Sequence, residues 1–458
     1  MEQTTFIDQI RTYRLTPTQI LALGFAFLIT VGTILLSLPF AAADGRVIAP
    51  LDALFTATSA ICVTGLIIKD TPVDFSLFGQ IVILVLIQVG GLGYMSVATF
   101  LLVALGKRIG LRERMVIQET LSAFTMEGLI RFIIGILKFT LLLEFTGAVL
   151  LAVRFLQDMS LSKAVYFGIF HSISAFNNAG FSLFSNSLMN YRTDPTVNGV
   201  VMVLVILGGL GFLVYQDLLK RINREVLRVS LHTKIALVST GIILLIGWAG
   251  IFVFERQNPG ESFKTFSWAD QALTALFQSV SARTAGFNTV DVGTLTAPTL
   301  YLLVLLMFIG ASPGSTGGGI KTTTAAIMAA ALWSTMRGRE DVTLFYRRIS
   351  PQVVAKAFFL AAMAMTFITG LTILLLYSEG QAMLQTLFEV ASAAGTVGMS
   401  TGNGGSLSLS ALFGDFGKTV IILTMFLGRI GPLVIGVTAL THIQRSRYRY
   451  PEGKVMIG

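Results

Sequence analysis

Long apolar runs separated by short polar stretches recur from one end of the chain to the other. The first covers about residues 18–40, and runs of similar length follow it. A run of about 20 apolar residues is long enough for a helix to cross the hydrocarbon core of a bilayer. In that core a helix satisfies its own backbone polar groups. The pattern therefore predicts an all-α integral membrane protein with several spans.

Four short segments between these runs share one arrangement of residues. Each has a phenylalanine, then serine and alanine, then a glycine followed by a large apolar residue. They are FTATSAICVTGL (55–66), FHSISAFNNAGF (170–181), FQSVSARTAGF (277–287) and FEVASAAGTVGM (388–399). Their glycines, Gly65, Gly180, Gly286 and Gly398, recur about every 110 residues, which indicates an internal repeat.

An apolar run precedes each segment, and another follows it. The preceding runs lie at about 18–40, 129–153, 232–254 and 352–377, and the following runs at about 76–105, 197–219, 298–335 and 416–440. Short helices are predicted in between, at roughly 52–61, 164–176, 269–282 and 382–393. They are too short to cross about 30 Å of hydrocarbon at about 1.5 Å per residue, so they are expected to re-enter on the side where they began.

The repeated unit is therefore a span, a re-entrant pore helix, a glycine turn and a second span. Four such units around a central pore predict a pseudo-fourfold fold with eight transmembrane spans. The chain then divides into a cytoplasmic N-terminal segment (1–17), pore repeats at 18–105, 129–219, 232–335 and 352–440, and a cytoplasmic C-terminal tail (441–458).

The basic residues give these units an orientation. They cluster between the units, at RIGLRER (108–114), KRINREVLR (220–228), RGRE and YRRI (337–349) and RSRYR (445–449). Basic loops stay in the cytoplasm, so both termini are expected there and the glycine turns are expected to enter the membrane from outside. These loops also account for the net charge of +9, and nucleic-acid binding is not expected.

Composition narrows the classes of function. Only 12% of the residues are charged and 54% are hydrophobic, whereas soluble domains carry about 25% charged residues. The single cysteine, Cys62, excludes an intrachain disulfide, and the three histidines are too scattered to predict a metal site. The spans also lack the residue clusters that acid–base or metal catalysis needs. A protein that is not an enzyme, and that moves a solute across the membrane, is expected.

The glycine turns favour a cation. Re-entrant helices aim partially negative C-terminal ends at a common centre, and the carbonyl oxygens that follow can replace an ion's hydration shell, as in K⁺ channels. Glycine permits the backbone conformation that this requires. Because the other side chains differ between the turns, backbone carbonyls are the expected ligands, and Arg283 is expected to bond outside the filter.

The predicted selectivity filter takes three or four residues from each turn, and the cation is expected at the four glycines. The filter residues are Cys62, Val63, Thr64, Gly65, Asn178, Ala179, Gly180, Thr284, Ala285, Gly286, Thr396, Val397 and Gly398. Aspartates on the inferred outer side would raise the local cation concentration, although solvated loop charge explains them equally well. These are Asp44, Asp70, Asp74, Asp194, Asp270, Asp291 and Asp415.

The second span of the third unit contains GASPGSTGGGIKTTT (310–324). Unwound backbone at membrane depth is tolerated only where protein or water surrounds it, so residues 310–321 are expected to form a gate loop beneath the filter. The other three second spans are expected to continue as helix. The predicted gate residues are Gly310, Pro313, Gly314, Gly317, Gly318, Gly319, Lys321 and Arg429.

Two of these gate residues are cations at membrane depth, which indicates function. Arg429 is expected to contact the gate loop and to stabilise its closed form. The alternative for Lys321 is snorkelling towards the cytoplasmic interface. The alternative for Arg429 is structural bonding to carbonyls freed by Gly428, Gly431 and Pro432.

The chain resembles a known family at several of these motifs and over nearly its whole length. They are FHSISAFNNAGFSLF (170–184), SARTAGFN (281–288), STGGGIK (315–321), GRIGPL (428–433) and YPEGKVMIG (450–458). They are similar to KtrB-type membrane subunits of bacterial Ktr potassium uptake systems, in the TrkH/KtrB/HKT superfamily of K⁺ transporters. Pro313 departs from the resemblance, because a small residue is expected there, and a proline stiffens the backbone.

The resemblance implies a multi-pass protein of the bacterial plasma membrane that takes up K⁺, with Na⁺ as an activator. It implies a homodimer with one pore in each chain, surrounded by membrane lipid and controlled by a cytosolic ring of nucleotide-binding KtrA-type subunits. No cofactor is expected on this chain, and ATP or ADP would act only through the partner. The loop itself departs from the phosphate-binding pattern, because Ile320 separates Gly319 from Lys321. An alternating-access cation symporter is the alternative function.

Overall fold

The computed structural model describes residues 17–93, 96, 129–224, 226–256, 258, 267–402 and 406–431. Several predictions fall on residues outside these ranges. They concern most of the N-terminal segment, residues 97–105 of the first repeat, the basic cluster 108–114, residues 432–440 of the fourth repeat and the C-terminal tail.

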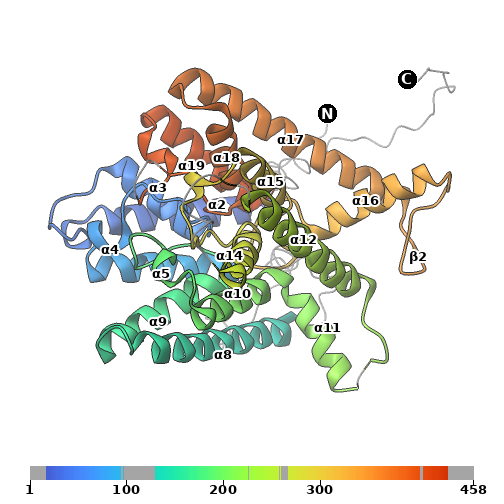
Figure 1. Ribbon diagram of the computed structural model, residues 1–458, viewed down its shortest axis with the longest axis horizontal. Coiled ribbons are helices and arrows are strands. Elements are labelled where there is room, and N and C mark those ends of the chain that lie inside the picture. Colours follow the sequence, from blue (N-terminus) through green and yellow to red (C-terminus); the bar gives the residue numbers. More distant parts are fainter. Residues whose placement is uncertain are drawn as a thin grey trace, which may run out of the picture.

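The described chain is almost entirely helical, and the helices follow the order predicted for four units (Figure 1). Four long helices begin the units: α2 (Pro17–Leu36), α8 (Leu129–Phe155), α12 (Leu231–Glu255) and α17 (Pro351–Glu379). Four short helices follow them: α3 (Pro50–Ile61), α9 (Leu161–Phe176), α14 (Trp268–Ser281) and α18 (Met383–Gly395). The second-span helices are α5 (Leu77–Leu92), α10 (Pro195–Leu210), α15 (Ala297–Phe308) and α19 (Asp415–Ile430).

The remaining elements are short or lie between the units. They are α4 (Thr71–Asp74), α11 (Phe212–Ile222), α16 (Thr322–Met336), the 3-10 helices η1 (Pro39–Ala41), η2 (Met189–Tyr191), η3 (Val292–Thr294) and η4 (Leu409–Leu412), and the strands β1 (Thr343–Leu344) and β2 (Arg347–Arg348). The two strands pair antiparallel between α16 and α17. This hairpin is a small departure from the predicted all-α fold.

Ordinary capping residues begin many of these helices. Asp194 caps α10 by accepting hydrogen bonds from two backbone N–H groups, those of Thr196 and Val197. Ser230 caps α12 in the same way through Thr233 N–H. Such caps satisfy N–H groups that have no partner within the helix. The helix starts are therefore local sequence features.

Within the described ranges, four helices are long and apolar enough to cross a membrane by length and composition: α2, α8, α12 and α17. The pair α10 and α11 makes a fifth span if its two parts are counted together. The helices α5 and α15 are shorter and apolar. The protein is therefore a multi-pass membrane protein, while eight spans and two cytoplasmic termini stay predictions.

The second spans are interrupted, contrary to the expectation that three of them continue as helix. The helices α10 and α11 meet at Gly211 with a bend of 95°. The helices α5 and α19 also end at glycines with positive φ, Gly93 at 77° and Gly431 at 91°. Glycine reaches such backbone angles without a steric penalty. A second-span helix thus stops at this place in every unit. The described residues show the chain resuming as helix in the second unit, after Gly211, and in the third, after the 310–321 loop.

The units pack against one another in a cycle. Each second-span helix contacts the short helix of the next unit: α5 contacts α9, α10 contacts α14, and α15 contacts α18. The last helix, α19, contacts α3 of the first unit and closes the cycle. The short helices therefore lie at the centre, with the long helices around them.

The described basic loops lie at one end of the molecule. The end of α11, with Lys220 and Arg221, and the β1–β2 hairpin, with Arg347 and Arg348, both lie at the right of Figure 1. The turn around α4 lies at the opposite end of this view. The positive-inside rule would place the basic loops at the right of this view in the cytoplasm, and that orientation stays a prediction.

Candidate functional site

The four glycine turns meet at one place. A Cβ atom added to any of the four glycines would overlap a backbone carbonyl oxygen of the next unit. Gly65 faces Ala179 O, Gly180 faces Ala285 O, Gly286 faces Val397 O, and Gly398 faces Thr64 O. The contacts therefore form a closed ring of four glycines and four carbonyl oxygens. No residue other than glycine fits these positions without displacing an oxygen of the ring.

The backbone of the four turns follows one pattern. The four glycines have φ between 71° and 91°. Positive φ also occurs two residues earlier, at Val63 (55°), Asn178 (60°), Thr284 (73°) and Thr396 (51°). Residues other than glycine rarely adopt this backbone conformation. Backbone strain of this kind is concentrated at functional sites. Because the same unusual conformation occurs in all four turns, their backbones are expected to have the same function.

The end of each short helix holds its own turn. The N–H of Thr64 donates to Ser59 O at 2.8 Å, and the N–H of Val397 donates to Ser392 O at 2.8 Å. The turns that end at Gly180 and Gly286 carry matching bonds to the carbonyls of Ser174 and Ser281. Since these bonds run backwards along the chain, each turn folds tightly over its helix end.

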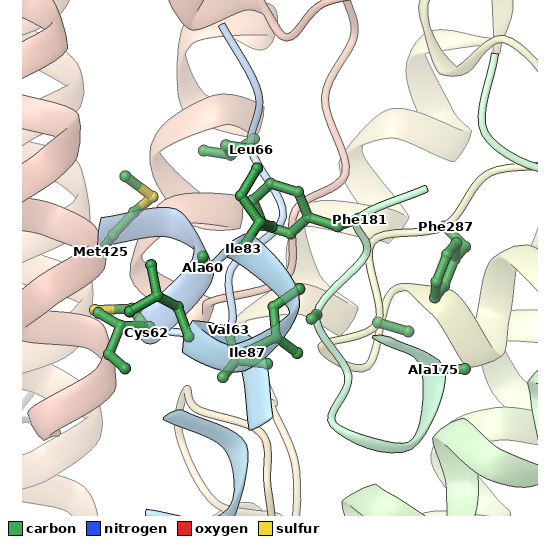
Figure 2. Close-up of a cluster of buried hydrophobic side chains, with 14 of the residues drawn as sticks. Ala60, Cys62, Val63, Leu66, Ile83, Ile87, Ala175, Phe181, Phe287 and Met425 are labelled. Atoms are coloured by element: carbon green, nitrogen blue, oxygen red, sulfur yellow. The ribbon is translucent and has the colours of Figure 1, made fainter. Parts of the chain in front are cut away.

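An apolar shell surrounds the first turn. Figure 2 shows Cys62, Val63 and Leu66 in a buried cluster with side chains of α5 and with Met425 of α19. Phe181 and Phe287, which follow two of the glycines, belong to the same cluster. Close packing of this kind resists displacement of the backbone. Cys62 is therefore placed as part of the packing, with its thiol buried.

Two cavities lie on either side of the ring. One, of about 340 Å³, is lined by the four glycines and by polar residues that follow them, such as Ser182, Asn288 and Ser400. The other, of about 540 Å³, is lined by the 310–321 loop, by Lys321 and Arg429, and by residues at the ends of the second-span helices. The ring and the loop therefore separate two spaces large enough for hydrated ions.

The aspartates contribute less to the outer cavity than expected. Asp291 lines it, and its carboxylate accepts a hydrogen bond from Gly293 N–H at 2.9 Å. Asp194 is instead paired with Arg154 at 2.5 Å. None of the other five predicted aspartates lines this cavity in the described part of the chain. Asp291 is thus the one predicted aspartate that lines the outer cavity in the described part of the chain, and local structure explains Asp194.

The 310–321 loop packs directly against two of the turns. Gly318 N–H donates to the Thr396 hydroxyl at 3.1 Å, and a Cβ atom added to Gly317 would overlap the Thr284 hydroxyl. Thr284 and Thr396 are two of the four non-glycine turn residues with positive φ. Glycines at 317 and 318 thus allow the loop to lie flat beneath the turns.

The loop is also tied to the second unit. Ser312 N–H donates to Gly209 O at 3.0 Å, and Phe212 N–H donates to Gly314 O at 2.8 Å. A Cβ atom added to Gly211 would overlap Pro313 O. The bend at Gly211 therefore makes room for the loop, and Pro313 lies at that contact.

Lys321 bonds the loop itself. Its Nζ donates to Gly317 O at 2.7 Å and lies 3.5 Å from Gly318 O. Gly310 packs against Gly318 and Gly319 on the other strand of the loop. The side chain therefore turns back into the loop, in contrast to the snorkelling alternative.

Arg429 joins three units. From α19 its guanidinium donates to Thr316 O in the loop and to Gly90 O at the end of α5. It also lies 3.5 Å from Gly91 O. These carbonyls belong to the first and third units, rather than to Gly428 and Gly431 beside it as the structural alternative supposed; Pro432 lies outside the described residues.

The contact of Arg429 with the loop is therefore present, while its effect on a closed state stays a prediction. Arg283 differs from expectation. It is buried, and its Nε has no hydrogen-bond partner among the described residues, so the expected bond is not seen at that nitrogen.

Two sets of residues were visible in the sequence but had no assigned role. The serine before alanine in each short helix bonds the turn that follows, as detailed below. Gly90, Gly208 and Gly428 lie where a Cβ atom would overlap carbonyls at the ends of short helices, those of Ile61, Phe176 and Ala394. The repeat of these residues was the available signal, but their contacts depend on the packing of separate helices.

Comparison with known proteins identifies the class. A family model described as TrkH, cation transport protein, matches residues 14–448. The chain therefore belongs to the TrkH family of cation transport proteins.

Particular relatives are similar over nearly the whole chain. The Ktr system potassium uptake protein B of Bacillus subtilis (strain 168) is 41% identical, covering 98% of both chains. The protein of the same name from Vibrio alginolyticus is 38% identical, covering 96% of this chain and 94% of its own. The crystal structure of the potassium transporter TrkH from Vibrio parahaemolyticus has a TM-score of 0.71 at 21% identity, covering 96% of this chain and 87% of its own. That structural similarity concerns the fold.

Proposed function

We propose that this chain takes up K⁺ across the bacterial plasma membrane through a channel-like pore. The four glycine turns form the selectivity filter, and the 310–321 loop forms the gate beneath it. The observation that carries the proposal is the closed ring of glycines and carbonyl oxygens. Potassium uptake is also the activity in the printed names of the Bacillus subtilis and Vibrio alginolyticus relatives.

The mechanism follows from the chemistry of the ring. A dehydrating K⁺ ion exchanges water oxygens for carbonyl oxygens, and four turns provide them without any charged side chain. Partially negative ends of α3, α9, α14 and α18 add to the attraction. Transport also requires that the ion leave, and neutral carbonyls hold it less strongly than carboxylates do.

The gate acts one step further along the path. With the loop in contact with Thr284 and Thr396, an ion leaving the ring meets backbone rather than water. Displacement of the loop would join the outer and inner cavities. Lys321 and Arg429 hold the loop in its present position by bonding its carbonyls.

Uptake of Rb⁺ or K⁺ by cells that lack their own uptake systems tests the filter. Gly398→Ser is expected to lower K⁺ affinity and selectivity, because the new side chain displaces Thr64 O from the ring. The matched control is Gly370→Ser in α17, where a Cβ atom meets nothing within 4 Å. If Gly398→Ser takes up K⁺ with native affinity and selectivity, the filter assignment is wrong.

We also infer that the chain works as a homodimer with Na⁺ as an activator and a cytosolic KtrA-type nucleotide-binding ring as its regulator. The support is the similarity to proteins named as parts of a Ktr system, including protein D of Bacillus subtilis at 38% identity. Nucleotide would then act through the partner. Uptake that is the same with and without Na⁺ and the ring subunit would count against this assembly.

A further inference from the structure

In the first and fourth units, a serine of the short helix holds the N–H of the turn's glycine. Ser59 Oγ accepts from Gly65 N–H at 3.0 Å, and Ser392 Oγ accepts from Gly398 N–H at 3.0 Å. The N–H and C=O of a trans peptide point in opposite directions. With the N–H held from behind, the carbonyl of the same peptide points away from the short helix and into the ring.

In the second and third units, the matching serine holds a different group. Ser174 Oγ donates to Phe181 O at 2.7 Å, and Ser281 Oγ donates to Phe287 O. These carbonyls belong to the residue after the glycine. Because each of them points back at its short helix, neither can face the axis.

The corresponding carbonyls of the other two units are not held. These are Leu66 O and Met399 O, to which no described residue donates a hydrogen bond. All four serines are buried, with at most 2% of their surface exposed, so water does not compete for these bonds. The units thus differ in pairs, although their sequences share the same Ser-Ala motif.

We propose that these four serines are positioning residues that give the filter two kinds of unit. All four units present the carbonyl before the glycine, whereas only the first and fourth are free to present the carbonyl after it. An ion at the outer face is therefore held by two carbonyls and by water rather than by four carbonyls. This inference rests on the proposed function of the turns as a K⁺ filter.

The two pairs of serines are expected to respond in opposite ways to the loss of the hydroxyl. Ser59→Ala and Ser392→Ala free the glycine N–H, so a carbonyl leaves the ring and KM for Rb⁺ uptake rises. Ser174→Ala and Ser281→Ala free a carbonyl to face the axis, so KM and Vmax both fall because the ion is held more tightly. The loss of one hydrogen bond is expected to change KM by roughly 3- to 10-fold, upward in the first pair and downward in the second.

Matched controls separate this effect from general packing. Thr58→Ala removes a buried hydroxyl, one position from Ser59, that has no hydrogen-bond partner in the part of the chain that the structure describes. Ser172→Ala removes a hydroxyl that bonds Glu144 O, two positions from Ser174. Both controls are expected to keep the native KM. Ser59→Thr, which retains a hydroxyl, is expected to restore most of the affinity lost in Ser59→Ala.

The measurement is Rb⁺ uptake over a range of concentrations, normalised to the amount of protein in the membrane. Opposite shifts of KM in the two pairs support the inference. Shifts in one direction for all four serines, or shifts no larger than those of the controls, overturn it. Where an alanine variant is absent from the membrane, Ser→Cys at the same site carries the same test, because a thiol is a weak donor and acceptor.

The outcome is distinguishable from failure of the proposed function. If Gly398→Ser changes selectivity but the serine variants behave as the controls do, only the inference about the serines fails. If Gly398→Ser has no effect, the filter itself is wrongly assigned.

Discussion

At the scale of single residues, Arg429 connects the 310–321 loop to the ends of two helices. One guanidinium bonds the loop of the third unit and the end of α5 in the first, while its backbone belongs to the fourth. The last carbonyls of a helix lack the partners that interior carbonyls have, and Gly90 O accepts only the capping bond from Gly93 N–H at 3.3 Å among backbone donors of the described residues. A cation near a helix C-terminus is also favourable. Arg429 therefore stabilises a helix end and the present position of the loop together.

Replacing Arg429 by alanine is expected to increase K⁺ uptake. A hydrogen bond from a charged group contributes about 1.5–3 kcal/mol, so its loss raises the initial uptake rate by roughly tenfold or more when the loop is otherwise closed. Arg429→Lys keeps the charge but loses the planar set of donors. Its initial uptake rate is expected to lie between those of the native protein and Arg429→Ala. Unchanged or lower uptake in Arg429→Ala, at equal amounts in the membrane, would favour a purely structural role.

A second set of residues recurs in the short helices, and two of its members, His171 and Glu389, contact the chain beyond the glycines. The residue after phenylalanine in each short helix is polar and buried: Thr56, His171, Gln278 and Glu389. His171 lies 2.9 Å from the Ser182 hydroxyl, just after Gly180. Glu389 accepts from the Ser400 hydroxyl at 2.6 Å and from both the N–H and the hydroxyl of Ser410.

Glu389→Ala is expected to lower the stability of the folded protein. It leaves the Ser410 N–H buried without an acceptor, which costs about 1–3 kcal/mol. The melting temperature in detergent should be lower than that of the native protein. The decrease should be smaller for Glu389→Gln, because glutamine keeps one acceptor oxygen. Glu340→Ala, at an exposed position, is the control. Equal melting temperatures for Glu389→Ala and the control would contradict this assignment.

At the scale of elements, the second-span helices stop at matching places. Their glycines Gly93, Gly211 and Gly431 have φ of 77°, 93° and 91°, in a region that other residues avoid. The backbone conformation therefore favours glycine at all three positions, and the contact with Pro313 O favours it at Gly211 as well. The two reasons can be separated by experiment.

Gly211→Ala is expected to displace the loop, because the new Cβ would overlap Pro313 O. Gly431→Ala imposes similar backbone strain, of about 1–3 kcal/mol, but meets no described atom within 4 Å. Both variants should be less stable, whereas only Gly211→Ala should leak K⁺. Equal leak in both variants would show that strain, rather than contact with the loop, controls the gate.

The sequence predicted the elements well because the signals were local. Each short helix is an apolar segment followed by a turn that contains a glycine. Because the same pattern occurs four times, each copy supported the prediction for the others. The helix ends at Gly93, Gly211 and Gly431 were missed, because a glycine in an apolar span is also common in continuous membrane helices. Whether the helix stops at Gly211 depends on its neighbour Pro313, which is 102 residues away and belongs to another unit.

The site was predicted only in part, because some of its features have a local sequence signal and others depend on contacts between distant residues. The ring glycines were found from their repeat, whereas the two bonding directions of Ser59 and Ser174 could not be found. Both serines stand in the same Ser-Ala motif, and the difference arises from the peptide orientation of the turn. The bonds of Arg429 cross 113 and 339 residues of sequence, so no local pattern contains them.

At the scale of the whole molecule, two closures lie in series. In the proposed function the ring between the cavities selects and the loop beneath it blocks. The two share few contacts, among them those of Gly318 with Thr396 and of Gly317 with Thr284. The ring itself is held by the short helices and by neighbouring units. A pore built in this way should keep its filter when its gate is removed.

Deletion of residues 314–319 tests that independence and separates the pore from the alternating-access alternative. In a pore, the deletion is expected to raise uptake while the preference for K⁺ over Na⁺ stays close to native, since the ring carbonyls keep their supports. In an alternating-access symporter, the loop is a moving part of the transport cycle, and its loss should stop uptake. The measurement is Rb⁺ uptake with and without competing Na⁺, with Gly370→Ser as the control for insertion. High uptake without selectivity would contradict both mechanisms, because it would mean that the loop is part of the filter.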